Sequence, residues 1–315
     1  MTLRPSSRCT RTLVALLAVS LGSARADDND LTLETLIGHP ALPGTAPTIT
    51  TATRSRYVGL VSQLGVALAP RLVQPADSLG WSGFAVDFDA SATQIDRDAD
   101  YWQRGVQRVR GAYLSVIGAT VRKGLWLGAP QLEMSFGGHH LSNSRMYTLE
   151  LGAKLALHEG FCGWHVPSIA ARVAVAQLFG SPELGLTVLD AGLVVSKRFA
   201  IAGTLQLDPY LGADLLVIFA RSRVIDTTPE VDAYEQQPNA VDESANVTLP
   251  NPGNLPRVRV QAGMRMRLSL FAVTVEAAYA LCNGTGRSCD RGGDSHVVDR
   301  SRGQLQINLG AGLVY

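Results

Sequence analysis

The feature that most constrains this chain is a set of long segments in which every second residue is apolar. Residues 257–269, which read RVRVQAGMRMRLS, alternate valine, alanine, methionine and leucine with arginine, glutamine and glycine. Residues 271–279 (FAVTVEAAY) and 304–315 alternate in the same way. An apolar side chain at every second position is typical of a β-strand with one apolar face. The sequence therefore predicts a protein made mostly of β-strands.

The length of these segments separates a soluble β-protein from a barrel that crosses a membrane. A strand needs about 9–11 residues to cross a bilayer, whereas strands of soluble proteins most often have about 5–6. The segments are longer than that, which predicts an all-β fold, a transmembrane antiparallel up-and-down β-barrel with its apolar faces toward lipid. About ten strands are expected, at residues 81–94, 110–122, 130–139, 145–157, 168–179, 184–198, 203–221, 255–269, 271–281 and 303–315.

The first residues of the chain have the order of an export signal. Arg4, Arg8 and Arg11 precede a short apolar run at 13–21, and Ala-Arg-Ala follows at 24–26. This order of charged, apolar and small residues is typical of a cleaved signal peptide. The apolar run is too short for a membrane-spanning helix, which needs about 20 residues. We therefore predict a signal peptide over residues 1–26.

Residues 27–80 form a separate region before the predicted barrel at 81–315. The stretches LTLETL and SRYVGLVSQLGVALAP fit short helices, either in the periplasm or as a plug inside the barrel mouth. A second interpretation makes strands of residues 46–54 and 57–69 and raises the count to twelve. We expect ten strands, preceded by a short irregular or helical N-terminal segment.

The end of the chain resembles the assembly signal of bacterial outer-membrane β-barrel proteins. That signal has a polar residue, a glycine two residues later, then a hydrophobic residue and a final aromatic residue. Asn308, Gly310, Leu313 and Tyr315 stand at these positions. The resemblance implies insertion by the barrel assembly machinery into the outer membrane of a Gram-negative envelope. The expected partners there are outer-membrane lipid and lipopolysaccharide, and no specific functional family is implied.

Both termini of such a barrel lie in the periplasm, and its outer loops are longer than its periplasmic turns. The longest predicted connections fall on one side, which assigns that side to the cell exterior. The outward connections are residues 95–109, 140–144, 180–183, 222–254 and 282–302.

The charge balance and the cysteines indicate which partners and which redox environment to expect. The 28 basic and 27 acidic side chains nearly cancel, which argues against a nucleic-acid partner. No cofactor or metal is expected, and the oligomeric state stays open. Export permits disulfides, and Cys282 and Cys289 bracket a turn-rich stretch, NGTGRS, so these two are predicted to pair. Cys162 has no assigned role.

The faces opposite the apolar ones carry both signs of charge. Barrels of about eight strands are filled by side chains, and open channels appear at about 16–18 strands. Ten strands therefore predict a lumen filled by an ion-pair network. The alternative is an anion-preferring constriction formed by the arginines of residues 257–267. The lumen-facing candidates are Asp87, Asp89, Glu133, Glu150, Lys154, Arg172, Asp190, Asp214, Arg257, Arg259, Arg265, Arg267 and Glu276.

Two functions follow from these predictions. The first is passive or selective, porin-like transport of small solutes. The second is a structural or surface-interaction barrel whose lumen is filled and whose outer loops meet the surroundings.

An outer-membrane hydrolase is a third interpretation. The stretch GGHHLSNSR resembles the G-x-x-H-x-S-N-G motif of outer-membrane phospholipase A, with Ser144 in place of the last glycine. The resemblance implies a serine nucleophile activated by a histidine, so His140 and Ser142 are the catalytic candidates. The segment that supplies the asparagine partner in that family is missing, which favours a barrel without catalysis.

Three other groups of residues could carry chemistry. Asp294 and His296 are similar to the Asp-x-His pair of omptin proteases, for which Asp87 and Asp89 would supply the further aspartates. The aspartates of DRDAD, residues 96–100, stand two apart, a spacing that suits calcium. His158 and His165 flank Cys162, a grouping that could hold a metal ion. Solvated loops and turns are the expected setting for the last two groups.

Overall fold

The structure is a computed structural model. It describes residues 28–38, 47–109, 111–125, 131–160, 166–201, 204–227, 246–282, 299 and 301–315. The predicted signal peptide, Cys162, Cys289 and the Asp294–His296 pair lie outside these residues.

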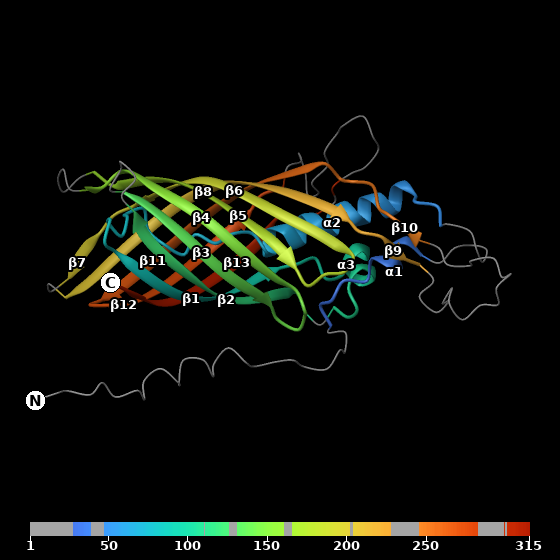
Figure 1. The fold of residues 1–315 in the computed structure, drawn as a ribbon, viewed down its shortest axis with the longest axis horizontal. Helices are drawn as coiled ribbons and strands as arrows, with labels where there is room; N and C mark the ends of the chain where they lie inside the picture. The colour runs from blue at the N-terminus through green and yellow to red at the C-terminus, as the bar shows by residue number, and fades with distance from the viewer. Residues whose placement is uncertain are drawn as a thin grey trace, which may run out of the picture.

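Ten antiparallel strands close into a barrel (Figure 1). Each strand pairs with its neighbours along the chain, and β1 pairs with β13 to close the ring. The prediction of a ten-stranded up-and-down barrel is confirmed. The strands of the ring are β1 (Phe84–Gln94), β2 (Tyr113–Leu125), β3 (Leu132–Leu141), β4 (Tyr147–His158), β5 (Ser168–Phe179), β6 (Leu184–Ser196), β8 (Leu205–Ser222), β11 (Asn254–Leu268), β12 (Phe271–Ala280) and β13 (Gln304–Val314).

Three short strands lie outside the ring. β7 (Phe199–Ile201) pairs with the first residues of β8. β9 (Ile225–Asp226) and β10 (Asn246–Val247) pair only with each other. None of them adds a strand to the wall, so the ring keeps its ten members.

The two faces of the wall differ as the alternation predicted. Outward side chains are apolar and exposed, including Phe88 at 64% and Leu211 at 66%. Inward side chains are largely polar, and most are buried. A slip of one residue in strand pairing would exchange the two faces. The alternation along each strand therefore fixes the register of the barrel.

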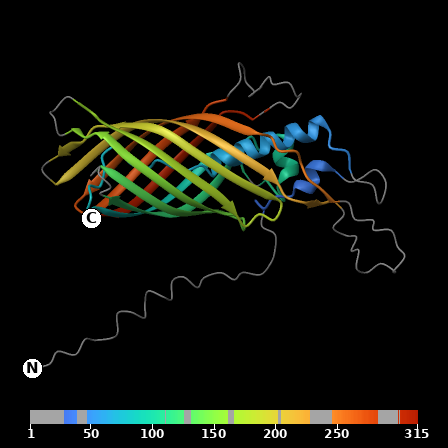
Figure 2. The ribbon, with the colours of Figure 1, turned by 45° about the horizontal axis from the view of Figure 1, so that its top comes forward.

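Three helices lie together at one end of the barrel, opposite Tyr315, with α2 reaching into the barrel mouth (Figures 1 and 2). We call this the helical end and the opposite one the turn end. The helices are α1 (Leu33–Ile37), α2 (Thr51–Ala67) and α3 (Asp100–Gly105). None of the helices in the described part of the chain is long and apolar enough to span a membrane.

The twelve-strand alternative is wrong because most of residues 57–69 belong to α2. Thr50 caps the start of the helix: its hydroxyl oxygen accepts a hydrogen bond from the backbone N–H of Thr53 at 3.2 Å. Residues from Tyr57 to Ala67 are buried all round. A helix that is buried on every side shows no single apolar stripe, so its sequence lacks a clear helical period.

The helical end is closed by an apolar core, which we call the cap core. It joins α2 to side chains of α1, α3 and the strand ends around the barrel mouth. A Cβ at Gly65 would lie 2.6 Å from a methyl carbon of Ile218 in β8, so only glycine permits this approach of helix and wall.

Residues 68–80, which we call the plug segment, continue from α2 through the lumen to the turn end, where β1 begins. The carbonyl oxygen of Pro70 accepts a hydrogen bond from Arg259 of β11. Ser78 bonds to Glu159, which follows the last residue of β4 at the turn end. The described residues between Asp28 and Gly38 lie at the helical end, where the N–H of Asn29 donates to the Asn143 carbonyl oxygen and that of Leu33 to the Glu183 carboxylate.

Candidate functional site

The interior of the barrel is the candidate functional site. The predicted lumen-facing residues, apart from Arg267, place their side chains there. They are Asp87, Asp89, Glu133, Glu150, Lys154, Arg172, Asp190, Asp214, Arg257, Arg259, Arg265 and Glu276.

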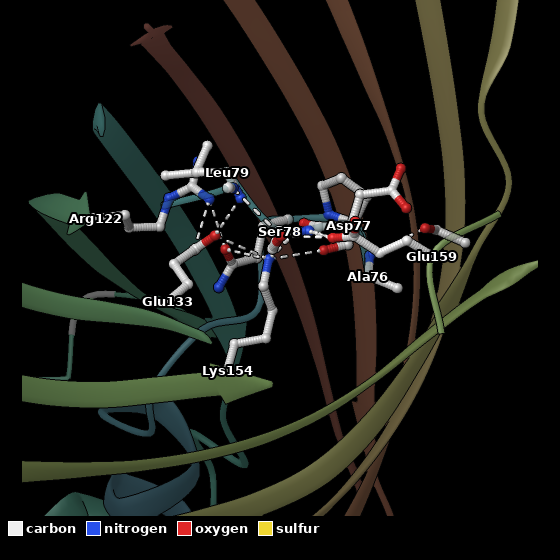
Figure 3. A network of polar contacts seen from close by, with 12 residues as sticks. Ala76, Asp77, Ser78, Leu79, Arg122, Glu133, Lys154 and Glu159 are labelled. Atoms are coloured by element: carbon white, nitrogen blue, oxygen red, sulfur yellow. Dashed lines mark hydrogen bonds and ion pairs between the residues drawn. The ribbon is translucent and has the colours of Figure 1, made fainter. Parts of the chain in front are cut away.

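One cluster binds the plug segment to strands β2, β3 and β4 (Figure 3). Glu133 accepts hydrogen bonds from Arg122 at 3.0 Å and from the backbone N–H of Leu79 at 3.2 Å. Lys154 donates to the carbonyl oxygens of Pro75 at 3.1 Å and Asp77 at 2.9 Å. The charged wall therefore bonds the plug mostly through the plug's backbone, which has no side-chain freedom to lose.

The plug segment is also held at the turn end. The backbone N–H of Ser78 donates to the Glu159 carboxylate at 2.9 Å, and the Ser78 hydroxyl donates to the same oxygen at 2.5 Å. Arg198 forms ion pairs with Asp77 at 2.8 Å and with Asp208 at 3.1 Å. Arg198 is 42% exposed, so solvent screens these pairs more than those deeper in the lumen.

A second buried cluster lies on β5, β6, β8 and β11. Asp190 pairs with Arg172 at 2.8 Å and with Arg259 at 3.0 Å. Arg259 also pairs with Asp214 at 2.8 Å and donates to the carbonyl oxygen of Pro70 at 2.7 Å. Burial of unpaired charge is costly. In this cluster the wall therefore supplies both the positive and the negative charges, and the plug adds only a carbonyl oxygen.

Glu276 of β12 is a third anchor for the plug. Its carboxylate accepts hydrogen bonds from the backbone N–H of Val73 at 3.0 Å and from the Tyr210 hydroxyl at 2.8 Å. The Asn308 amide donates to its other oxygen at 2.6 Å. Val73 has a φ of 43°, which is unfavourable for a β-branched residue. The hydrogen bond to Glu276 holds this strained residue in place.

One small cavity in the lumen, beside the plug, is lined by charge. A cavity of about 40 Å³ lies beside Arg71, Asp89, His139 and Glu150. Arg71 of the plug pairs with Asp89 at 2.9 Å, and Asp89 lies 3.1 Å from Nε2 of His139. A space of this size holds a water molecule or two and no larger solute.

The arginines proposed for an anion constriction do not converge. Arg257 lies near α2 and donates to the hydroxyl oxygens of Ser62, in that helix, and of Ser301. Arg259 belongs to the second buried cluster, and Arg265 pairs with Asp87 at 3.0 Å. Arg267 is half-buried at the turn end, where its Nε donates to the Ser269 carbonyl oxygen. The four side chains have separate partners.

The catalytic candidates point away from this interior. His140 is exposed on the outer face of β3, and Ser142 lies half-buried in the turn that follows. The backbone N–H of Ser142 donates to the Ser115 carbonyl oxygen at 2.9 Å. No hydrogen bond joins His140 to Ser142 in the described chain. Asp87 and Asp89 are held in ion pairs inside the barrel.

The other predicted sites are dispersed or outside the described chain. No group of three potential metal ligands occurs among the described residues. Asp96 pairs with Arg302, and Asp98 with Arg97. Cys282 is disulfide-bonded, and its predicted partner Cys289 lies outside the described residues.

Asp100 of α3 has two basic partners, Arg104 at 2.7 Å and Arg56 of α2 at 2.5 Å. Partial burial alone would raise the pKa of Asp100, but the hydrogen bond from Arg104 and the charge of Arg56 hold the pKa below its usual range. Asp100 therefore joins α2 to α3 at the surface.

Sequence reasoning missed the plug residues and the pairing of Asp89 with both Arg71 and His139. Arg71, Gln74, Asp77 and Ser78 lie in a stretch with neither a helical nor a strand period. The available signal was the density of hydrogen-bonding groups and prolines directly before a transmembrane strand. That signal indicates an irregular segment but does not say what the segment contacts.

The terminal residues of the proposed assembly signal have different environments. Asn308 is buried on the inner face, where it bonds to Glu276. Gly310 faces the plug segment, because a Cβ there would lie 2.9 Å from Val73. Leu313 and Tyr315 are exposed on the outside, at 51% and 82%.

No protein-family model and no curated protein matches this chain. Among solved structures, it is similar to the N-terminal β-barrel domain of OprF from Pseudomonas aeruginosa, with 10% identity, 75% of this chain and 99% of that chain covered, and a TM-score of 0.27. It is also similar to the outer membrane protease OmpT from Escherichia coli, with 8% identity, coverage of 74% and 96%, and a TM-score of 0.31.

A third similar structure is the translocator domain of the autotransporter NalP from Neisseria meningitidis, at 9% identity. The match covers 74% of this chain and 88% of that chain, with a TM-score of 0.31. These proteins resemble the chain as barrels, and none of their activities carries over at such scores. The closed fold rests on the strand pairing itself.

Proposed function

We propose that the chain is an integral β-barrel of the bacterial outer membrane that is plugged by its own N-terminal region. The apolar outer surface of the barrel supports the membrane location, because soluble proteins rarely expose an apolar surface of this size to water. The terminal aromatic residue and the short turns at the turn end support a periplasmic position for that end. The helical end then faces the cell exterior.

The observation that carries this proposal is the path of the plug segment through the lumen. Charged groups on β1, β4, β11 and β12 bond it at successive depths from Pro70 to Asp77, and Glu159, which follows β4, bonds Ser78. The cavity beside the plug, at about 40 Å³, is too small for a nutrient-sized solute. The barrel therefore serves as a closed scaffold that presents its helical end at the cell surface.

Single-channel conductance of the refolded full chain in a planar bilayer tests the closed lumen. We expect no stable open steps. A matched variant locks the plug by a disulfide between Val73→Cys and Gly310→Cys, because a Cβ at position 310 would lie 2.9 Å from Cγ1 of Val73. The single variant Val73→Cys is its control. Open steps that persist in the locked variant would contradict the proposal.

Solute transport after withdrawal of the plug is a second candidate function. It is favoured by the wall, whose buried ion pairs are mostly wall to wall, as between Arg259 and Asp214 or between Arg122 and Asp87. Such a wall keeps its charges paired when the plug leaves. Open steps in the full chain that vanish in the locked variant and return on reduction would support this candidate over the closed scaffold.

A further inference from the structure

A hollow lies on the outer face of the barrel across β1 to β4, toward the helical end. Its floor is formed by Ala119 and Gly138, which are direct partners in the sheet. Phe88 flanks this row through its pairing with Ala119. The next row toward the helical end contains His140 between Ile117 and Tyr147. Bulky side chains thus surround two small ones.

Nothing inside the barrel requires glycine at position 138. Its backbone φ is not positive, and the nearest atom to an added Cβ would be a side-chain carbon of Leu149 at 3.7 Å. The inward Gly118 differs, because its Cβ would lie 2.1 Å from the His139 ring. Of the glycines in described strands, only Gly185 has similar room, beside the helical end of β6. Glycine weakens a strand and often marks the close approach of a ligand.

His140 is a polar side chain on the outer face, between the cross-strand neighbours Ile117 and Tyr147. No hydrogen bond or ion pair reaches it from the described part of the chain. The outward polar residues Gln177 and Thr187 differ, because they hydrogen-bond to each other at 2.5 Å. A polar group without a partner is costly in an apolar medium. The partner of His140 therefore has to come from outside the described residues.

We propose that the hollow binds lipopolysaccharide, with one acyl chain over Gly138 and an anionic head group near His140. The inference rests on the proposed membrane location and orientation, which place the helical end in the outer leaflet. An exposed cation supports an anionic lipid. Arg145 lies in the turn after β3, and among the described residues its guanidinium forms one ion pair, with Asp30 at 3.8 Å. The hollow takes the apolar chain, and His140 and Arg145 bind the head-group phosphate.

Native mass spectrometry of the refolded full chain in nanodiscs tests this site. The nanodiscs contain phosphatidylcholine with either lipopolysaccharide or phosphatidylglycerol as the added lipid. Gly138→Leu fills the hollow and is accommodated by the wall, because the added Cβ meets only Leu149. The matched control is Ala191→Leu, an outward substitution on β6 beside Val173 and Leu215.

We expect Gly138→Leu to weaken lipopolysaccharide retention roughly tenfold, as loss of the contacts of one buried acyl segment implies. Ala191→Leu is expected to leave retention unchanged, and His140→Leu to reduce the preference for lipopolysaccharide over phosphatidylglycerol. Equal retention by Gly138→Leu and wild type would overturn the site. Equal binding of phosphatidylglycerol and lipopolysaccharide by the wild type would overturn the choice of lipid.

Heat-modifiable mobility in gel electrophoresis distinguishes a failure of the lipid site from a failure of the proposed function. A folded, heat-modifiable barrel without lipopolysaccharide preference contradicts only the lipid site. A chain that shows no heat modification and enters the soluble fraction contradicts the membrane barrel itself, and the lipid site with it.

Discussion

The two halves of the barrel interior are filled by different chemistry. At the helical end, α2 packs its apolar side chains against strand ends in the cap core. Toward the turn end, the plug segment lies among buried charges such as Glu133, Lys154 and Asp190. One continuous stretch of chain, residues 51–80, supplies both fillings. The change from apolar to polar contacts occurs where the helix ends, at Ala67.

The difference follows from what each filling can satisfy. A helix satisfies its own backbone hydrogen bonds, so an apolar surface suffices to bury it. The plug segment is irregular, and its buried N–H and C=O groups need partners from the wall. Glu133 and Glu276 accept from plug N–H groups, and Lys154 and Arg259 donate to plug carbonyl oxygens. The polar half is therefore more specific, and the apolar half is more tolerant of substitution.

The largest expected effect lies in the polar half. Asp190→Asn leaves Arg172 without the carboxylate that lies 2.8 Å from it, and an uncompensated buried charge costs about 3–5 kcal/mol. The unfolding free energy of the barrel in urea measures this loss. The counterpart is Asp208→Asn at the turn end. It should cost less than about 1 kcal/mol, because the partner left behind, Arg198, is 42% exposed to water and keeps its ion pair with Asp77.

The double variant Arg172→Met/Asp190→Leu sharpens the comparison. It removes both charges of the pair, so its unfolding free energy should recover most of the loss seen for Asp190→Asn. Additive losses would mean that the two charges act through other partners and that the wall does not pair its own charges.

The apolar half gives the next effect. Leu64 of α2 is 1% exposed in the cap core, and Leu64→Ala is expected to destabilise the cap by about 3 kcal/mol through lost burial and a residual cavity. Hydrogen exchange of the α2 amides measures this opening. Leu64→Met keeps the volume and should cost less than about 1.5 kcal/mol. A larger loss for Leu64→Met than for Asp190→Asn would reverse the expected order of tolerance.

A smaller effect is expected where α2 begins. Thr50→Ala removes the hydroxyl that accepts from the Thr53 N–H at 3.2 Å, a loss of about 1 kcal/mol. Faster hydrogen exchange should be confined to the first turn of α2, and Thr50→Ser should restore protection. Faster exchange along the whole helix would show that the cap core depends on its first turn.

The smallest effect concerns pH at the helical end. Burial raises the pKa of Glu183, and the N–H of Leu33, which donates to its carboxylate at 2.6 Å, only partly offsets this. A raised folded pKa means that docking of α1 is strongest below the unfolded pKa and weakens as pH rises through the folded one. Exchange at Leu33, corrected for its intrinsic pH dependence, reports this window just above the usual glutamate range.

Glu183→Gln is the control for that titration. Its docking of α1 should not change across the same pH window, because the amide carries no ionisable proton. A wild-type profile equal to that of Glu183→Gln would assign the pH response to another group.

The wall of the site followed from sequence far better than its contents. Arg259 and Asp214 were predicted to face inward because they occupy alternate positions in strands with an apolar opposite face. Their pairing partners were not predictable, because register between β8 and β11 decides which charges meet. Arg267 stands two residues after Arg265, so it shares the inward face of β11, yet it bonds to Ser269 at the turn. The alternation in sequence predicts the face of the sheet, whereas depth in the lumen depends on how far the strand extends.

The sequence by itself determined the class, the strand count and the two faces of the barrel, because the period of two is local and acts on every strand. Only the tertiary structure decided that α2 enters the barrel mouth and that residues 68–80 occupy the lumen. A helix buried all round and an irregular polar segment have no period to read. Their positions depend on partners far away in the chain, such as Ile218 for Gly65 and Glu276 for Val73.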